Sequence, residues 1–303
     1  MLLQKIPTLS KKISTIIGIS AVFFWGMNVG LIRNVSINFG ALGGATLIYT
    51  ISTFFLFFTI GLPKFQQINK KYLIIGGLIF VACELCFSLS IGYSQNNQQA
   101  IEVGMINYMW PALTLIFSII FTNIKANILI FPGCILAIIG IIRVLGGDNG
   151  FDIKLIYQHL LDNPISYSLA FGSALLWAIY CVVTVKMSNG QNLITIFFTL
   201  CSITLWIKYL YIGNHTIYIT SDNIMSLIYA SGALGLGYAA WNLGIVSGNV
   251  TVLAGSSYFT PVLSTFFASL LLNTDLSFIF WQGVILVTFG AILCWLATKN
   301  STT

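Results

Sequence analysis

Two stretches of this sequence decide its fold: Ile106–Thr114 reads INYMWPALT, and Ser256–Ser264 reads SSYFTPVLS. They match at an offset of 150 residues, and each places a tyrosine three positions before a proline inside a long apolar run. The same offset aligns two glycines of the first half with two of the second, namely Gly133 and Gly140 with Gly283 and Gly290. Trp25 aligns with Trp177 at an offset of 152. The sequence therefore predicts two similar halves, residues 1–150 and 151–303.

The composition surrounding these stretches is that of a protein in lipid. Of the 303 residues, 57% are hydrophobic and only 7% are charged, whereas a soluble domain carries about 25% charged residues. We therefore expect an integral membrane protein whose main partner is the lipid bilayer. The net charge of +6 forms no basic stripe interleaved with aromatic residues, which argues against a nucleic-acid partner.

Apolar runs of about 20 residues predict membrane-spanning helices. Helices rather than open strands are expected, because lipid offers no hydrogen-bond partners to an unpaired backbone. The fold class we predict is an all-α membrane protein with ten transmembrane helices, near residues 13–33, 42–62, 72–93, 100–122, 127–147, 164–187, 192–213, 223–246, 250–272 and 278–298. The longest connection, 147–164, separates two sets of five. Since five is odd, the second repeat must be inverted, an architecture typical of secondary transporters with a substrate site near the midplane.

The placement of lysine and arginine predicts the orientation, because cytoplasmic loops carry an excess of both. With the N-terminus in the cytoplasm, nine basic residues fall inside and four outside. The inner set is Lys5, Lys11, Lys12, Lys64, Lys70, Lys71, Lys125, Lys186 and Lys299, and the outer set is Arg33, Arg143, Lys154 and Lys208. We therefore expect both termini to be cytoplasmic.

The matched prolines, Pro111 and Pro261, lie near the middle of predicted helices 4 and 9. A proline inside a helix frees the carbonyl four residues earlier, which here belongs to Asn107 and Ser257. Interruptions at corresponding positions of two repeats point to a transporter site. The alternative is a kink that serves only helix packing.

Two acidic residues lie within the predicted spans, Glu84 in helix 3 and Glu102 near the start of helix 4. Ionised carboxylates are costly in a membrane, so each is a functional candidate. Glu84 is expected either to carry a proton or pair with a substrate amine, or to be a hydrogen-bonded structural residue. Glu102 is expected to be an interfacial charge that favours a helix N-terminus.

Aromatic and polar residues flank the same positions and complete the predicted substrate site. Aromatic rings can form stacking walls for a planar solute, and polar helix faces in lipid point into the bundle or a wet cavity. The residues concerned are Tyr108, Trp110, Tyr238, Trp241, Asn242 and Tyr258.

No constellation of catalytic or metal-ligating residues stands out. Cys83 and Cys86 have CxxC spacing but no nearby histidine or second pair, so we interpret them as small hydrophobic residues. His159 and His215 are isolated in predicted loops. Gly235–Ala240 reads as GxGxxA, but without a βαβ context it is not a dinucleotide site. We expect no metal, no cofactor and no enzymatic activity.

Several longer stretches resemble a known family. They are VGLIRNVS (Val29–Ser36), QAIEVGMINYMWPALT (Gln99–Thr114), VLGGDNG (Val144–Gly150), LGYAAWNLGIVSGNVT (Leu236–Thr251), SYFTPVLS (Ser257–Ser264) and LCWLAT (Leu293–Thr298). Together they are similar to the drug/metabolite transporter superfamily (EamA-like), and within it to exporters of aromatic amino acids. The resemblance implies ten helices in two inverted repeats, a cavity between helices 3, 4, 8 and 9, and export of aromatic and other neutral amino acids.

The sequence thus predicts a monomeric exporter in the bacterial inner membrane that works by alternating access. Carbonyls and amides near Asn107 and Ser257 would hold the head group, and Tyr108, Trp110, Tyr238 and Trp241 would enclose the ring. The alternatives are the same fold with cationic drugs, other metabolites or nucleotide sugars as cargo, a channel, or a membrane-embedded enzyme or receptor.

Overall fold

A computed structural model describes residues 9–64, 68–122, 126–212 and 220–299. Lys5, Lys125 and His215 lie outside the described residues. Within those residues, eight helical segments are long and apolar enough to cross a membrane. Two further apolar helices, Ile130–Leu145 and Thr260–Leu271, are shorter. Large apolar side chains cover the outside of the bundle, among them Phe58, Leu78 and Leu210, which are 70%, 68% and 71% exposed. A surface of this kind suits a multi-pass membrane protein.

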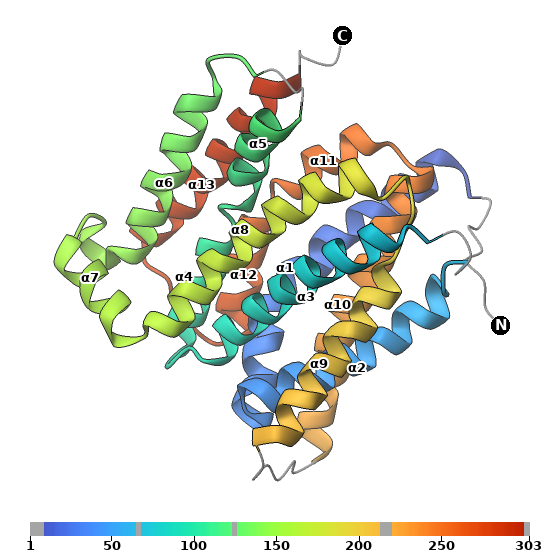
Figure 1. Ribbon diagram of the computed structural model, residues 1–303. Coiled ribbons are helices and arrows are strands. Elements are labelled where there is room, and N and C mark those ends of the chain that lie inside the picture. The colour runs from blue at the N-terminus through green and yellow to red at the C-terminus, as the bar shows by residue number, and fades with distance from the viewer. Residues whose placement is uncertain (1–8, 65–67, 123–125, 213–219, 300–303) are drawn as a thin grey trace.

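The helices of the first half follow one another with short connections (Figure 1). Ser10 caps the first helix by accepting a hydrogen bond from the Ile13 amide, and Asn69 caps the third from Lys71 and Tyr72. The bounds are α1 Lys11–Phe39, α2 Ala41–Thr59, α3 Lys70–Gly92, α4 Asn97–Asn107, α5 Trp110–Phe121 and α6 Ile130–Leu145.

After α6, two short elements precede the long apolar helices of the second half. The bounds are η2 Gly147–Asn149, α7 Ile153–Asp162, α8 Pro164–Met187, α9 Ile194–Ile212, α10 Ser221–Ser247, α11 Val250–Ser257, α12 Thr260–Leu271 and α13 Phe278–Lys299. The ten-residue helix α7 corrects the sequence interpretation, which left 147–164 as a connection. Its exposed apolar side chains, such as Ile153 at 78% and Leu161 at 60%, are typical of a helix at a membrane surface.

Predicted helices 4 and 9 are not continuous kinked helices. Each breaks into two at the residues before its proline, so that Pro111 and Pro261 stand in the first turn of α5 and α12. At the first break, the amides of Tyr108 and Met109 bond three residues back instead of four, at 3.0 Å each. Proline is well tolerated in a first helical turn because no intrahelical donor is needed there.

The helices pack in pairs that join distant parts of the chain. α1 packs against α10 and α12, α3 against α8, α2 against α9 and α10, and α6 against α13. Glycines permit the closest of these contacts. A methyl group placed on Gly140 of α6 would lie 2.7 Å from the Gly283 carbonyl oxygen of α13, so that no larger residue fits without a backbone shift.

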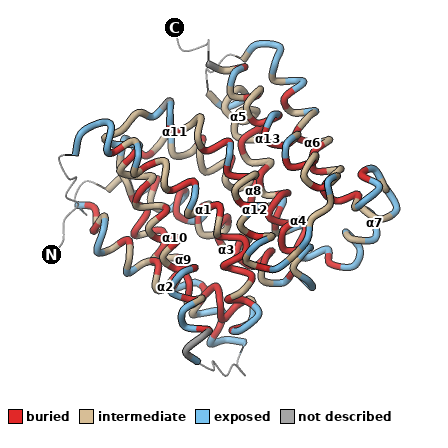
Figure 2. The backbone as a smooth tube through the Cα atoms, turned by 180° about the vertical axis from the view of Figure 1, so that it is seen from behind, coloured by how far each residue is buried: buried red, intermediate tan, exposed pale blue. Residues whose placement is uncertain are grey.

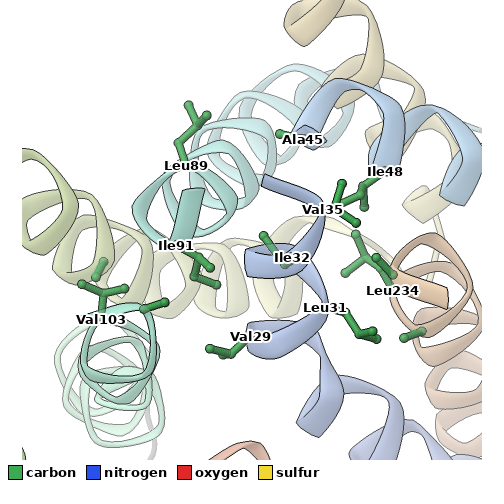
Figure 3. Close-up of a cluster of buried hydrophobic side chains, with 14 of the residues drawn as sticks. Val29, Leu31, Ile32, Val35, Ala45, Ile48, Leu89, Ile91, Val103 and Leu234 are labelled. Carbon is green, nitrogen blue, oxygen red and sulfur yellow. The ribbon is translucent and has the colours of Figure 1, made fainter. Parts of the chain in front are cut away.

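The buried interior surrounds α1, as Figure 2 shows by the red segments near the middle of the bundle. Val29, Ile32 and Val35 of α1 are at most 1% exposed. Figure 3 shows Val35 beside Ile48 of α2, and Ile32 on the side of Ile91 of α3. Each fully buried aliphatic side chain of this size contributes about 1.5–3 kcal/mol in a soluble core; in lipid, close packing has to replace much of that term.

Hydrogen bonds tie several connections together at one end of the bundle. Arg33 near the end of α1 donates to the Ser94 carbonyl oxygen at 2.6 Å and to Asn97 Oδ1 at 3.3 Å. Asn97 in turn donates to the Leu272 carbonyl oxygen at 3.1 Å, just after α12. Asn163, between α7 and α8, donates to the Tyr93 carbonyl oxygen at 3.0 Å. The ends of α1, α3, α7 and α12 therefore share one side.

The two broken helices differ in how tightly they are packed. Ser264, Thr265 and Ala268 of α12 are at most 2% exposed, whereas α5 buries only Pro111 and Ala112. The α1 surface beneath α12 holds Gly26 and Gly30, which let α12 approach closely. At the offset of 152, α8 carries the larger residues alanine and valine instead, at positions 178 and 182.

Candidate functional site

A buried carboxylate lies at the centre of the predicted site. Glu84 on α3 is 5% exposed. Tyr49 on α2 donates a hydrogen bond to Glu84 Oε2, and Tyr238 on α10 donates to Oε1, each at 2.7 Å. Buried polar groups must be satisfied in this way. The two phenols fix the carboxylate from opposite repeats of the sequence.

Aromatic rings surround the Tyr238 side of this carboxylate. The ring centroid of Tyr238 lies 5.0 Å from that of Phe198, 5.4 Å from Trp25 and 6.3 Å from Trp177. Trp177 also meets Trp110 edge-on at 6.2 Å. Such edge-to-face pairs hold rings in fixed orientations, so the cluster offers rigid apolar walls next to the carboxyl group of Glu84.

Asn107 is joined to the same region through α8. Its Nδ2 donates to Ser173 Oγ at 3.0 Å, and the thiol of Cys83 donates to the Ser173 carbonyl oxygen at 3.4 Å. Because Cys83 directly precedes Glu84, Ser173 connects the surroundings of Glu84 and Asn107. The Asn107 amide is thus linked through Ser173 of α8 to Cys83, the residue next to Glu84 in α3.

The carbonyls that the prolines were predicted to free are not equivalent. In the second break, the Thr260 hydroxyl donates to the Ser257 carbonyl oxygen at 2.6 Å, so that carbonyl already has a partner. The Ser257 hydroxyl donates to the Ala254 carbonyl oxygen at 2.8 Å. The head-group role predicted for Ser257 therefore requires these local hydrogen bonds to break. The Asn107 side chain, in contrast, makes its hydrogen bond to Ser173 of another helix.

The remaining predicted residues divide between two places. Trp241 packs on Trp25 with centroids 5.1 Å apart, which joins it to the Tyr238 cluster, and Asn242 follows it in a half-buried position. Tyr108 is buried in the core at the end of α4. Tyr258 stacks on Trp295 of α13 at 5.9 Å, and no contact places it beside Glu84 among the described residues.

Five residues of this cluster were not predicted from the sequence: Trp25, Tyr49, Ser173, Trp177 and Phe198. The alignment of the two tryptophans with each other in the repeat is a sequence signal that points to both of them. Tyr49 and Ser173 carry no pattern that separates them from other polar residues in helices. Their role appears only when α2 and α8 are packed against α3.

A pocket of about 420 Å³ lies elsewhere, at the start of α4 beside α7 and α8. It is lined by carboxamides, by Glu102 and by Tyr167 and His159. Glu102 is only 2% exposed and lies in the second turn of α4, near the start of that helix. His159 is not isolated in a loop: it lies on α7, with Nδ1 3.4 Å from Glu102 Oε2. This contact raises the pKa of the His159 imidazole above its ordinary value, against the opposing effect of burial.

The comparison with known protein families shows the family to which this chain belongs. Two copies of one family, described as the EamA-like transporter family, match residues 12–146 and 164–296. The chain belongs to the EamA-like transporter family. The break at Tyr108–Met109 lies within the first matched segment, and the break at Tyr258–Phe259 lies within the second.

Individual relatives are similar over almost the whole chain. The aromatic amino acid exporter YddG of Escherichia coli (strain K12) is 47% identical over 292 residues, covering 96% of this chain and 100% of that protein. The exporter of the same name from Salmonella typhimurium (strain 14028s / SGSC 2262) is 47% identical, covering 95% and 98%. A solved crystal structure at 18% identity superposes with a TM-score of 0.65, covering 97% and 100% of the two chains. That likeness concerns the fold alone.

Proposed function

We propose that this protein exports aromatic amino acids, and other neutral amino acids, from the cytoplasm. The observation that carries the proposal is the 47% identity, across the full length of the relative, with a protein named as an aromatic amino acid exporter. The names of the relatives favour aromatic amino acids over cationic drugs, other metabolites or nucleotide sugars. The ring cluster around Tyr238 supports the same choice.

The architecture we infer is ten spans in two inverted five-helix repeats, residues 1–150 and 151–303. The two matched family segments support it, and so does the packing. If the repeats are exchanged, α1 against α10 becomes α8 against α3, and α1 against α12 becomes α8 against α5. All four pairs are in contact. The pair α6 and α13 maps onto itself, with Gly140 against Gly283 and Gly133 against Gly290.

We place both termini in the cytoplasm and the protein in the bacterial inner membrane, as a monomer. In this orientation Arg33, the start of α4 and helix α7 lie on the outer side. The opposite ends of the helices include the start of α6, where the Asn127 amide donates to the Ala297 carbonyl oxygen near the end of α13 at 2.9 Å. The excess of lysine at that end agrees with the rule that cytoplasmic loops are basic.

In the mechanism that we propose, Glu84 receives the ammonium group of the amino acid. Attraction between opposite charges is strong in a poorly solvated interior, and the two tyrosine hydroxyls hold the carboxylate in place beforehand. Asn107 and Ser173 would meet the carboxylate of the substrate, near the freed end of α4. Trp110, Trp177, Tyr238 and Trp241 would enclose the ring.

The unequal packing of the broken helices supports a state closed on the outer side. α12 is buried against α1, and Arg33 and Asn97 join the connections there. α5 is the more exposed counterpart on the inner side. We infer alternating access in which the α1–α12 contact opens as the equivalent α8–α5 contact closes.

Counterflow into liposomes tests the proposed function. Liposomes that contain the purified protein and are loaded with unlabelled phenylalanine should accumulate labelled phenylalanine or tryptophan. Unlabelled lysine added outside should reduce this accumulation only weakly. Protein-free liposomes give the background. Accumulation no greater than this background would refute export of aromatic amino acids by this chain.

A further inference from the structure

The pocket at the outer end of α4 contains an acidic group that the export site leaves unused. Glu102 Oε2 accepts a hydrogen bond from Tyr167 at 2.6 Å, and Oε1 accepts one from Gln98 at 3.2 Å. The third neighbour is His159 on α7. A carboxylate has about four acceptor positions, so these contacts leave room for one more donor. Since Glu102 lines the pocket, that donor can come from the pocket.

The walls of the pocket are held by hydrogen bonds within the protein. Gln95 Nε2 donates to the Asp162 carbonyl oxygen at 2.9 Å, while Gln99 Oε1 accepts from the Gln95 amide at 2.7 Å and from Asn163 at 2.8 Å. These bonds tie the connection before α4 to the junction of α7 and α8. The cavity is therefore built from fixed polar groups and not from loose surface side chains.

The charges facing the pocket favour a cation. Its lining residues include Glu102 and Asp162 but, within the described chain, neither lysine nor arginine. Arg33 on α1 donates its hydrogen bonds to Ser94 and Asn97 instead of to these carboxylates. From α4, α7 and α8, the titratable groups that face the His159 imidazole are Glu102, Asp162 and Tyr167. His159 is the one group among them that can become positive.

We propose that this pocket is a second, exit-side binding site for an organic ammonium group, with Glu102 as its counter-ion and the His159 imidazolium as an internal competitor for the same carboxylate. The term exit-side rests on the proposed function, since the direction of export makes this end the one from which the amino acid leaves. Protonated His159 pairs with the Glu102 carboxylate and displaces the ammonium ligand. When His159 is neutral, the carboxylate is available to bind the ligand.

The two histidines of the chain make the test direct. Protein labelled with ¹⁵N-histidine shows only the imidazoles of His159 and His215, and the variant His215→Gln assigns them. The pH midpoint of His159 is then measured with sodium chloride, methylammonium chloride or phenethylammonium chloride at equal ionic strength. We expect the amines to lower this midpoint by roughly half a pH unit or more, because they displace the imidazolium from Glu102.

Variants define the site and separate it from general charge effects. In Glu102→Gln the midpoint should fall toward the ordinary value for histidine and no longer respond to amines. The control is Asp148→Asn, which removes an exposed carboxylate from the nearby turn η2 and should leave the response intact. The comparison of amines with sodium uses the wild-type protein, so it stands even if Glu102→Gln does not fold.

Either of two results would overturn the proposal: sodium and amines shifting the midpoint equally, or an amine response that survives in Glu102→Gln. Neither result bears on liposome counterflow. Conversely, a protein that binds amines at this pocket but fails to exchange phenylalanine would refute the proposed function and leave the ammonium site in place.

Discussion

At the scale of single residues, Glu84 and the two tyrosines that bind it form the most specific polar arrangement inside the bundle. Tyr49 and Tyr238 come from different halves of the chain and each donates to a different carboxylate oxygen. A hydrogen bond to a charged group contributes about 1.5–3 kcal/mol. The arrangement therefore fixes both the position of the charge and the relative position of α2, α3 and α10.

Replacing Glu84 by glutamine removes the charge that we assign to the ammonium group. We expect Glu84→Gln to lower phenylalanine counterflow tenfold or more, the factor that about 1.4 kcal/mol or more of lost interaction gives. Tyr238→Phe should lower it less, because Tyr49 still holds the carboxylate. The exposed Asp275 supplies the control, Asp275→Asn, and full activity of Glu84→Gln at equal protein levels would refute the role.

The residue scale also marks the limit of sequence reasoning. Glu84 could be predicted, because a carboxylate in an apolar run is rare and costly. Tyr49, Ser173 and the two tryptophans could not be assigned, since polar and aromatic residues are frequent in such helices and only tertiary packing selects among them. The contact between Glu102 and His159 could not be predicted, because the sequence pattern does not reveal helix α7, which carries His159.

At the scale of elements, the contact between α6 and α13 depends on the absence of side chains. Gly140→Ala would place a methyl group 2.7 Å from backbone atoms of Gly283 and Val287. We expect a loss of about 1–3 kcal/mol, the usual cost of overpacking, seen as a lower melting temperature in detergent. The matched change Gly172→Ala, where nothing lies within 4 Å, should leave the melting temperature unchanged or higher. Equal effects of the two changes would contradict this account.

Helix α7 is held to the bundle in part by a contact that depends on pH. The pKa of His159 is raised by Glu102, so the contact stabilises the folded state fully below the unfolded pKa of about 6.5. This stabilisation is lost as the pH rises through the raised pKa. Amide hydrogens of α7 should therefore exchange faster at pH 8.5 than at pH 6, after correction for intrinsic rates.

Mass spectrometry of hydrogen exchange in the α7 peptide measures this effect. His159→Gln should show little dependence on pH, because its side chain does not titrate in that range. If the variant and the wild-type protein lose protection equally between the two pH values, the contact between His159 and Glu102 does not hold α7.

The elements themselves were largely predictable, and their breaks were not. Apolar runs of about 20 residues located the long helices, because lipid imposes both their length and their composition. The prolines correctly marked the places where helices 4 and 9 are interrupted. Whether a proline kinks a helix or begins a new one depends on local bonds, such as that from Thr260 to Ser257, which the sequence pattern does not reveal.

At the scale of the whole molecule, the inverted repeat that we propose allows one structure to predict its alternate state. Ser118 on α5 and Ala268 on α12 are equivalent positions, and Ser118 is half-buried while Ala268 is fully buried. Cysteine at position 118 should react with a water-soluble maleimide about tenfold faster than cysteine at 268, which corresponds to a preference of about 1.4 kcal/mol for the outer-closed state. Unmodified protein, with its six native cysteines, gives the background.

Substrate should change this ratio if the repeats exchange their conformations. Excess phenylalanine is expected to slow labelling at position 118 and to speed it at 268, because a ligand shifts the populations of states for which its affinities differ. Labelling rates that remain the same with saturating phenylalanine would count against alternating access through these two helices.

The glycine contact between α6 and α13 has a consequence for biosynthesis. α6 ends at Leu145, and its partner α13 begins only at Phe278. During translation, the glycine surface of α6 therefore remains without its α13 partner in the membrane until the intervening helices have been synthesised. The contact between α6 and α13 can form only after α13 has been synthesised, so a truncated chain that lacks α13 would expose the glycine surface of α6 to lipid and to the quality-control proteases of the cell.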